Sequence, residues 1–303
     1  MIDNNKQIAW GAIFSYITIF ANALYGFIIA PYILKHVGES DYGVYQTIAA
    51  ISSSIMVIDV GLGGTVMKYM ATYKAQNETS KIGALLKIVF SFSGILAAVI
   101  VIITVILYAG FENIYGANFS FQEVSLGKQM LLLSVVNMLF VLFDDIFVGV
   151  ISGLNKHIVA NGIRLIKILL RYLLLFFLIP VVKSSILILI INILLTIVFM
   201  ALEFVICLPS FGYIKTKSRI ELSFIWEIIR YTFFMFAMAI INQFNSSFGN
   251  VIVGARLGTI SVTIYSFALT IFAAYEHLST SISKVMLPSV ANAIYQKQQP
   301  LKA

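Results

Sequence analysis

Long apolar stretches, separated by short polar segments, repeat along almost the whole 303-residue chain. A helix needs roughly 20 consecutive mostly apolar residues to cross the hydrocarbon core of a bilayer, and about eight stretches meet this requirement. These stretches are residues 8–33, 42–70, 82–109, 129–151, 162–179, 186–208, 224–244 and 260–287. Inside lipid the backbone must satisfy its own hydrogen bonds, which a helix does within one segment. We therefore predict an all-α, polytopic membrane protein with about eight transmembrane helices.

The composition excludes an ordinary soluble domain. Hydrophobic residues make up 60% of the chain and charged residues only 11%, whereas soluble domains average about 45–50% and about 25%. The formal net charge of +7 does not come from basic runs interleaved with aromatic residues, so we expect no nucleic-acid partner. The single cysteine, Cys207, cannot form a disulfide within the chain and is expected to serve in packing.

The distribution of lysine and arginine predicts the orientation in the membrane. If the N-terminus is cytoplasmic, 16 of the 20 basic residues lie in cytoplasmic segments or at cytoplasmic helix ends. Only Lys35, Lys128, Lys183 and Arg256 then lie on the outer side. This bias follows the positive-inside rule, and it predicts a multi-pass protein of the inner (cytoplasmic) membrane with a cytoplasmic N-terminus. The first apolar stretch is longer than a signal-peptide core, so we expect it to be a retained helix.

A short pattern occurs twice and predicts an internal repeat. Gly38 precedes Tyr45 by seven positions, and Gly258 precedes Tyr265 by seven positions. Each glycine lies at a predicted outer turn between an odd-numbered helix and the next. Two copies in the same orientation are typical of parallel repeats in transporters. We predict a six-helix N-terminal transmembrane lobe in residues 1–210 and the first two helices of an incomplete second lobe in residues 211–303.

Three basic residues fall within the fifth apolar stretch, where charge is costly. Arg164, Lys167 and Arg171 have the spacing i, i+3, i+7. On a helix this spacing places them within about 60° of one another, in a stripe about 10 Å long. The stripe suits an anion that moves between leaflets, and arginine suits a bidentate phosphate contact. The alternative for Arg164 and Lys167 is that they extend to the cytoplasmic headgroups.

Five acidic residues in the apolar stretches are candidates for ion coupling or for cavity lining. They are Asp59, Asp144, Asp145, Glu203 and Glu276. Asp59 carries a coupling ion, or it caps a bend at Gly61–Gly64. Adjacent helical residues point about 100° apart, so Asp144 and Asp145 cannot share one partner. Glu203 is expected at the same depth as Lys167, and an ion pair between the two is the alternative to a functional role for either.

Amide side chains gather at the outer end of the seventh apolar stretch. Asn242, Gln243 and Asn245 are candidates for sugar contacts, although amides also join helices by hydrogen bonds. The sequence contains no Walker loop, no dinucleotide-binding fingerprint and no metal-spaced His/Cys set. We therefore expect no cofactor, no metal site and no enzyme activity.

Four segments resemble bacterial polysaccharide flippases, the Wzx-like branch of the multidrug/oligosaccharidyl-lipid/polysaccharide (MOP) exporter superfamily. They are residues 37–45, residues 59–63 with Lys68 and Tyr69, residues 149–157 and residues 253–258. Two features depart from that family. An acidic residue usually precedes the last of these motifs, where this chain has Asn245 and Asn250. Family members also carry two complete lobes, so the resemblance implies a complete first lobe and part of a second.

This resemblance implies export of a polyprenyl-pyrophosphate-linked oligosaccharide for O-antigen, lipopolysaccharide, capsule or exopolysaccharide synthesis. Two lobes would enclose a cationic cavity and expose it alternately to each side of the membrane. The expected partners are the lipid-linked oligosaccharide, membrane lipids and other polysaccharide assembly proteins. Three alternatives stay open. They are a truncated, non-transporting relic or fragment, an exporter of drugs or smaller lipids, and a membrane polysaccharide polymerase or transferase using the connection at residues 110–128.

Overall fold

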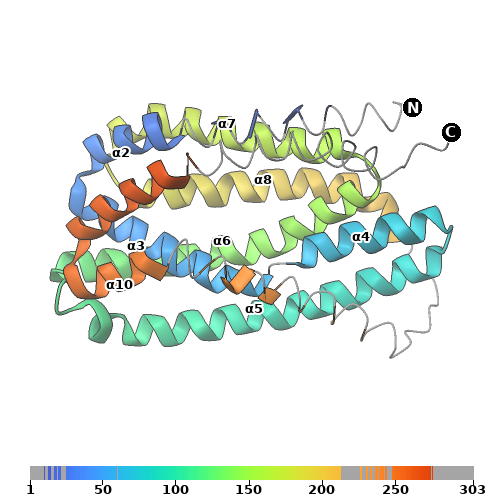
Figure 1. Cartoon of the computed structure of the whole chain (residues 1–303), viewed down its shortest axis with the longest axis horizontal. Helices are drawn as coiled ribbons and strands as arrows, with labels where there is room; N and C mark the ends of the chain where they lie inside the picture. The colour runs from blue at the N-terminus through green and yellow to red at the C-terminus, as the bar shows by residue number, and fades with distance from the viewer. Residues whose placement is uncertain are drawn as a thin grey trace, which may run out of the picture.

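The computed structural model describes residues 25–59, 61–212 and 248–273 continuously, and scattered residues in 10–21, 226–243 and at 275. Within these residues the chain forms helices joined by short turns and contains no β-strand. The long helices run along one common direction, as a bundle (Figure 1). The predicted all-α fold is confirmed.

Most of the elements follow the predicted apolar stretches, but one short helix, residues 248–257, lies between the seventh and the eighth of them. In chain order they are η1 (Tyr25–Ile29), α2 (Ala30–Val37), α3 (Glu39–Met56), η2 (Val57–Asp59), α4 (Leu62–Ala75), α5 (Thr79–Tyr115), α6 (Phe121–Gly153), α7 (His157–Val182), α8 (Ile186–Phe211) and α10 (Phe248–Leu257). A further apolar helix covers Thr259–Ala273. Within the described residues, five segments are long and apolar enough to cross a membrane: Glu39–Ala75, α5, α6, α7 and α8.

The outward faces of the long helices are apolar. Ile106 on α5, Phe177 on α7 and Val198 on α8 expose 65%, 63% and 61% of their surface. In water such a surface would favour aggregation, whereas lipid chains solvate it without penalty. The buried side chains instead form two packed clusters between the helices. The chain is therefore a multi-pass membrane protein.

The second predicted stretch, residues 42–70, is helical but broken in its middle. The 3-10 turn η2 follows α3, and α4 begins only after Gly61, whose φ is 110°. Residues with a side chain rarely adopt this left-handed backbone conformation, which glycine adopts without steric cost. The first residues of α4 receive no side-chain cap. The glycine-rich sequence therefore produces a real interruption of the helix and not only a kink.

Glycines allow α4 and α6 to cross at very short range. A Cβ atom at Gly149 would lie 2.6 Å from the carbonyl oxygen of Gly63, and one at Gly63 would lie 2.9 Å from the carbonyl oxygen of Asp145. A Cβ at Gly153 would lie 2.7 Å from the Cβ of Met70. Small residues four positions apart are how membrane helices bring their backbones together.

Residues 110–128, predicted as a connection outside the membrane, are mostly helical. Helix α5 continues to Tyr115 and α6 begins at Phe121, so only residues 116–120 form the turn. A capping box starts α6, because the side chain of Ser120 accepts from the Glu123 N–H while the Glu123 carboxylate accepts from the Ser120 N–H. Hydropathy missed these helical turns because they are polar, as helix ends outside the hydrocarbon core are.

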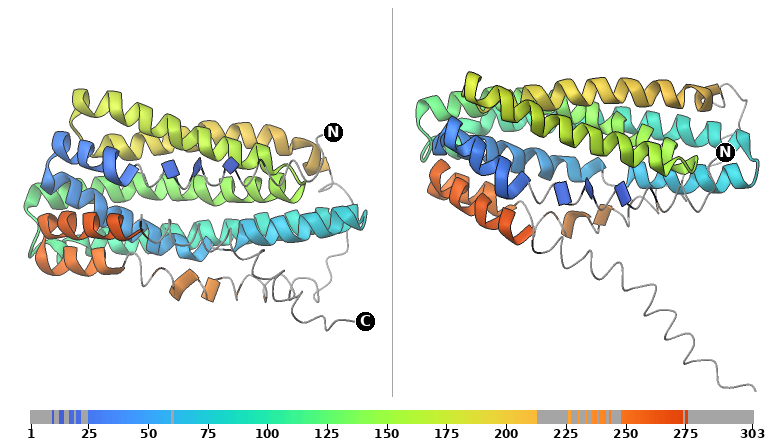
Figure 2. Two further views of the ribbon diagram at one scale, coloured as in Figure 1. Left: turned by 45° about the horizontal axis from the view of Figure 1, so that its top comes forward. Right: turned by 90° about the horizontal axis from the view of Figure 1, so that it is seen from above.

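The two copies of the predicted repeat have the same local geometry. Gly38 and Gly258 have φ values of 94° and 80°, and each joins one helix to the next. Both glycines and the turn at residues 116–120 lie at the same end of the bundle. We call this end the Gly38 end. The turns at Asn77 and Asn155 lie at the opposite Asn155 end. Figure 2 shows α2, α3 and the two helices of residues 248–273 gathered at the Gly38 end.

Replacing Gly149 by leucine is expected to destabilise the bundle, because the new side chain meets the α4 backbone, which cannot move aside as a side chain can. We expect a loss on the order of 3 kcal/mol in the free energy of unfolding. Gly94, which has open space around it on α5, is the matched control. Thermal unfolding of purified Gly149→Leu and Gly94→Leu in detergent measures the difference, and equal stabilities would contradict the packing role.

Candidate functional site

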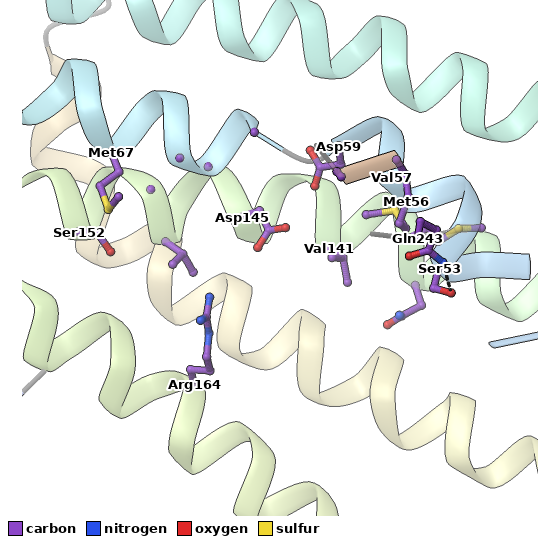
Figure 3. A pocket seen from close by; sticks show the side chains of 18 of the residues that line it. Ser53, Met56, Val57, Asp59, Met67, Val141, Asp145, Ser152, Arg164 and Gln243 are labelled. Carbon is purple, nitrogen blue, oxygen red and sulfur yellow. Dashed lines mark hydrogen bonds between the residues drawn. The ribbon is translucent and has the colours of Figure 1, made fainter. Parts of the chain in front are cut away.

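A cavity of about 1010 Å³ lies inside the helical bundle. Its walls come from α3, η2, the start of α4, the second half of α6 and the first turns of α7. Ala239 and Gln243, from the seventh apolar stretch, complete the lining. The break between α3 and α4 borders the cavity, since Val57, Asp59, Gly61 and Gly63 all line it. Figure 3 shows these elements converging on one space.

Uncharged polar side chains supply much of the lining. They are Ser52, Ser53, Asn137, Ser152, Asn161 and Gln243. Hydroxyl and amide groups both donate and accept hydrogen bonds, which is the chemistry needed to hold a polyhydroxylated ligand. Of these residues, only Gln243 was predicted from the sequence. The polar residues on α3 and α6 are spaced by helix geometry, so only the packed structure shows that they face a common space.

Charged side chains of both signs enter the same cavity. Asp59 on η2 and Asp145 on α6 line one wall, and Arg164 on α7 faces them (Figure 3). Asp59 is only 4% exposed, and its Oδ1 atom has no hydrogen-bond partner. The Asp59 and Asp145 carboxyl groups lie close enough to interact directly, and Arg164 acts electrostatically on Asp145. His157, the first residue of α7, lines the cavity as well.

A second charged group lies beside the cavity, between α6, α7 and α8. Lys167 donates to Asp144, with 3.0 Å between Nζ and Oδ2. Glu203 on α8 is buried and interacts electrostatically with both Asp144 and Lys167. Lys167 therefore forms its ion pair with Asp144 and not with Glu203, the partner predicted from the sequence. The residues Asp144 and Asp145 diverge, as their 100° separation requires.

The third basic residue, Arg171, lies among tyrosines. Its guanidinium carbon is 5.5 Å from the centre of the Tyr25 ring, and Tyr25 stacks on Tyr172 at 5.0 Å. The Nε atom of Arg171 is buried without a hydrogen-bond partner. Such an arrangement stabilises the cation through the ring faces.

The predicted basic stripe is therefore divided among three environments. Arg164 faces the cavity, Lys167 pairs with Asp144, and Arg171 contacts Tyr25. All three project from α7, as the spacing requires, but helices α3, α6 and α8 supply different partners at each level.

Among the predicted amides, Gln243 donates to the hydroxyls of Ser53 and Ser54 at 2.9 and 3.4 Å. It thereby connects the seventh apolar stretch to α3. The remaining candidates Asn242, Asn245 and Glu276 lie outside the described residues. Among the residues that the structure does describe, no three His, Cys, Asp or Glu side chains are arranged to hold a metal ion.

Comparison with known proteins relates this chain to a family and to a fold. The family model described as "Polysaccharide biosynthesis protein" matches residues 8–294. Among the solved structures with similar folds is an outward-facing multidrug resistance MATE family transporter of the MOP superfamily, with a TM-score of 0.58 and 14% identity. Another is a MOP superfamily transporter from Pyrococcus furiosus, described as having a binding pocket of reverse polarity, with a TM-score of 0.57 and 15% identity.

The match covers 91% of this chain in both cases, but only 64% and 65% of the two transporters. The chain therefore spans about two thirds of the length of these structures. At this level of identity the likeness shows a shared fold. No curated protein sequence matches the chain significantly.

Removing Lys167 is expected to leave Asp144 and Glu203 as neighbouring buried acids without a cation. We expect Lys167→Met to lower the free energy of unfolding by about 3 kcal/mol, and the added change Asp144→Asn to restore much of this loss. The exposed pair of Lys128 and Glu112 at the Gly38 end is the control, and Lys128→Met should cost less than about 1 kcal/mol. Chemical unfolding in detergent measures all three, and a double variant no more stable than Lys167→Met would contradict the coupling.

Proposed function

Because the chain belongs to the polysaccharide biosynthesis protein family, we propose that it carries a polyprenyl-pyrophosphate-linked oligosaccharide across the cytoplasmic membrane. The saccharide and phosphates pass through the cavity while the lipid chain stays in the bilayer. The transport path alternates between the two membrane faces. The basic residues concentrated at the Asn155 end support an orientation with that end and the N-terminus in the cytoplasm.

One observation carries this proposal, which is the chemistry of the cavity lining. A wall of hydroxyls and amides within an otherwise apolar bundle forms a space that suits a polar occupant. Asn137 and Asn161 offer donors and acceptors from α6 and α7, and Ser52 and Ser53 offer them from α3. Saccharide hydroxyls satisfy both kinds of group. The buried Oδ1 atom of Asn137 has no hydrogen-bond partner among the described residues, and a saccharide hydroxyl can donate to it.

Arg164 is the residue proposed to hold the phosphate. It lines the cavity at the first turns of α7, near the Asn155 end. Its side chain forms no ion pair with another described residue, whereas Lys167 pairs with Asp144. A guanidinium binds phosphate oxygens with two parallel hydrogen bonds. A phosphate entering from the Asn155 end would meet Arg164 first, and Arg171 lies farther along the same helix.

Asp59 and Asp145 are proposed to couple transport to an ion. They lie opposite Arg164, and Asp59 keeps one carboxyl oxygen without a partner. Two interacting carboxyl groups in a site shielded from water favour uptake of a proton or a monovalent cation. A phosphate bound to Arg164 would compete with Asp145 for the same positive charge. This competition gives a physical basis for exchange of the ion and the substrate.

Arg164→Ala is expected to abolish polysaccharide export without reducing the amount of protein in the membrane. Arg164→Lys keeps the charge but loses the bidentate geometry, so export should fall about tenfold. Arg256→Ala is the matched control, since Arg256 is exposed at the opposite end of the bundle. The measurement is the amount of surface polysaccharide in cells that carry only the variant gene. Normal export by Arg164→Ala would contradict the phosphate assignment.

Arg171→Ala is expected to differ from Arg164→Ala. It should also abolish export, but it removes the cation held by Tyr25 and should lower the midpoint of thermal unfolding as well. Arg164→Ala should leave the midpoint of thermal unfolding nearly unchanged, because Arg164 faces the cavity. Melting curves of the two purified variants, recorded beside the export assay, separate a cavity residue from one that also packs the helices. Normal export by Arg171→Ala would remove it from the transport path.

A further inference from the structure

A single carboxylate joins three helix beginnings at the Gly38 end. Glu123 Oε1 accepts from the hydroxyl of Ser40, in the first turn of α3, and from the hydroxyl of Thr259 at 2.7 Å. Glu123 Oε2 accepts from the N–H of Ser120 at 2.6 Å. Thr259 is the first residue of the helix that ends at Ala273. One acidic side chain therefore connects α3 and α6 to a helix that lies more than 130 residues farther along the chain.

Further contacts at the same end join the same two parts of the chain. Asn118 donates to the carbonyl oxygen of Ala255 at 2.9 Å, and Thr263 donates to the carbonyl oxygen of Glu39 at 2.8 Å. A Cβ atom at Gly43 would overlap the carbonyl oxygen of Thr259. The backbones of α3 and the Thr259–Ala273 helix are thus in direct contact, and the polar bonds close around this contact.

The chemistry around Glu123 suits an ionised carboxylate. All three of its partners donate hydrogen bonds, and a carboxylate only accepts them. Each partner also belongs to a helix beginning, where the unpaired N–H groups create a positive potential. Charge-assisted hydrogen bonds of this kind are about twice as strong as neutral ones. The carboxylate is therefore a specific connection and not a general polar contact.

The cavity lies away from this connection. Its lining extends from Ser52 on α3 to His157, which begins α7 at the Asn155 end. The Gly38 end, by contrast, is filled by packed backbone and by the Glu123 contacts. The cavity and the Glu123 contacts thus occupy different parts of the bundle.

We propose that Glu123 is a latch that closes the transport path at the Gly38 end. Its bond to Thr259 holds residues 248–273 against α3 and α6, and this bond breaks whenever the path opens toward that side. The Ser120 bond belongs to the capping box and persists, so the carboxylate stays in place for the next closure. This inference rests on the proposed alternating transport. It identifies the Glu123–Thr259 hydrogen bond as the closure of the path at the Gly38 end.

The latch is testable by cysteine accessibility in the full-length protein, without any substrate. Cys207 is the single cysteine, so Cys207→Ala provides a cysteine-free background. Ser53→Cys then places a reporter in the cavity, and Phe121→Cys, at an 86% exposed position of the Gly38 end, identifies the membrane side that this end faces. A membrane-impermeant maleimide is added from that side, and the labelling rate of Ser53→Cys is measured.

We expect Glu123→Gln and Thr259→Val each to raise this labelling rate about tenfold, the effect of losing one charge-assisted hydrogen bond. Glutamine still completes a capping box, so α6 should keep its first turn. Thr259→Val leaves Glu123 and Ser120 untouched, so it tests the connection even if Glu123→Gln folds poorly.

Glu112→Gln is the matched control, because Glu112 is an exposed acid at the same end that bonds only Lys128 among the described residues. The labelling rate of Ser53→Cys should be the same with and without Glu112→Gln. An unchanged rate in both latch variants would overturn the proposal, and so would an equal rise in Glu112→Gln. Because no saccharide is involved, the labelling result is independent of the export assays. Normal export by Arg164→Ala would contradict the phosphate assignment but would leave the labelling rates unchanged.

Discussion

The close crossing of α4 and α6 determines where the site lies. Gly63 and Gly149 bring the two backbones into contact, and in lipid such contact is a main source of helix association. The same crossing places the interruption before Gly61 next to Asp145. Non-helical backbone at membrane depth is tolerated only where protein or a water-filled space covers it. The helix break, the glycine contact and the cavity are therefore parts of one arrangement.

Much of the fold was predictable because lipid imposes a simple rule on the sequence. Residues that face the acyl chains must be apolar along a full membrane thickness, so α5, α6, α7 and α8 appear directly as apolar stretches. The ends of these helices were not predictable in this way. The turn after Tyr115 is short because α6 begins with a capping box at Ser120, and helical residues outside the hydrocarbon core carry no hydropathy signal.

The candidate site was predictable only in part, for a related reason. A charge such as Arg164 or Asp59 stands out in an apolar stretch, because burying it requires a compensating partner or a function. A serine such as Ser53 does not stand out, since it can bond to its own helix. Which charges meet depends on the rotation of each helix. The spacing on α7 correctly aligned three cations, but only packing shows that Lys167 faces Asp144 and Arg171 faces Tyr25.

The position of Glu123 also has a consequence for biogenesis. Helices α3 and α6 emerge from the ribosome well before Thr259, and membrane helices insert individually before they associate. The capping box holds the Glu123 carboxylate in place using residues from its own turn, so an acceptor is already oriented when residues 248–273 arrive. The two helices of residues 248–273 then dock against α3 and α6, which are already in place. The order of synthesis and the order of assembly thus coincide. This order reduces the chance that residues 248–273 pack against the wrong face of α3 or α6.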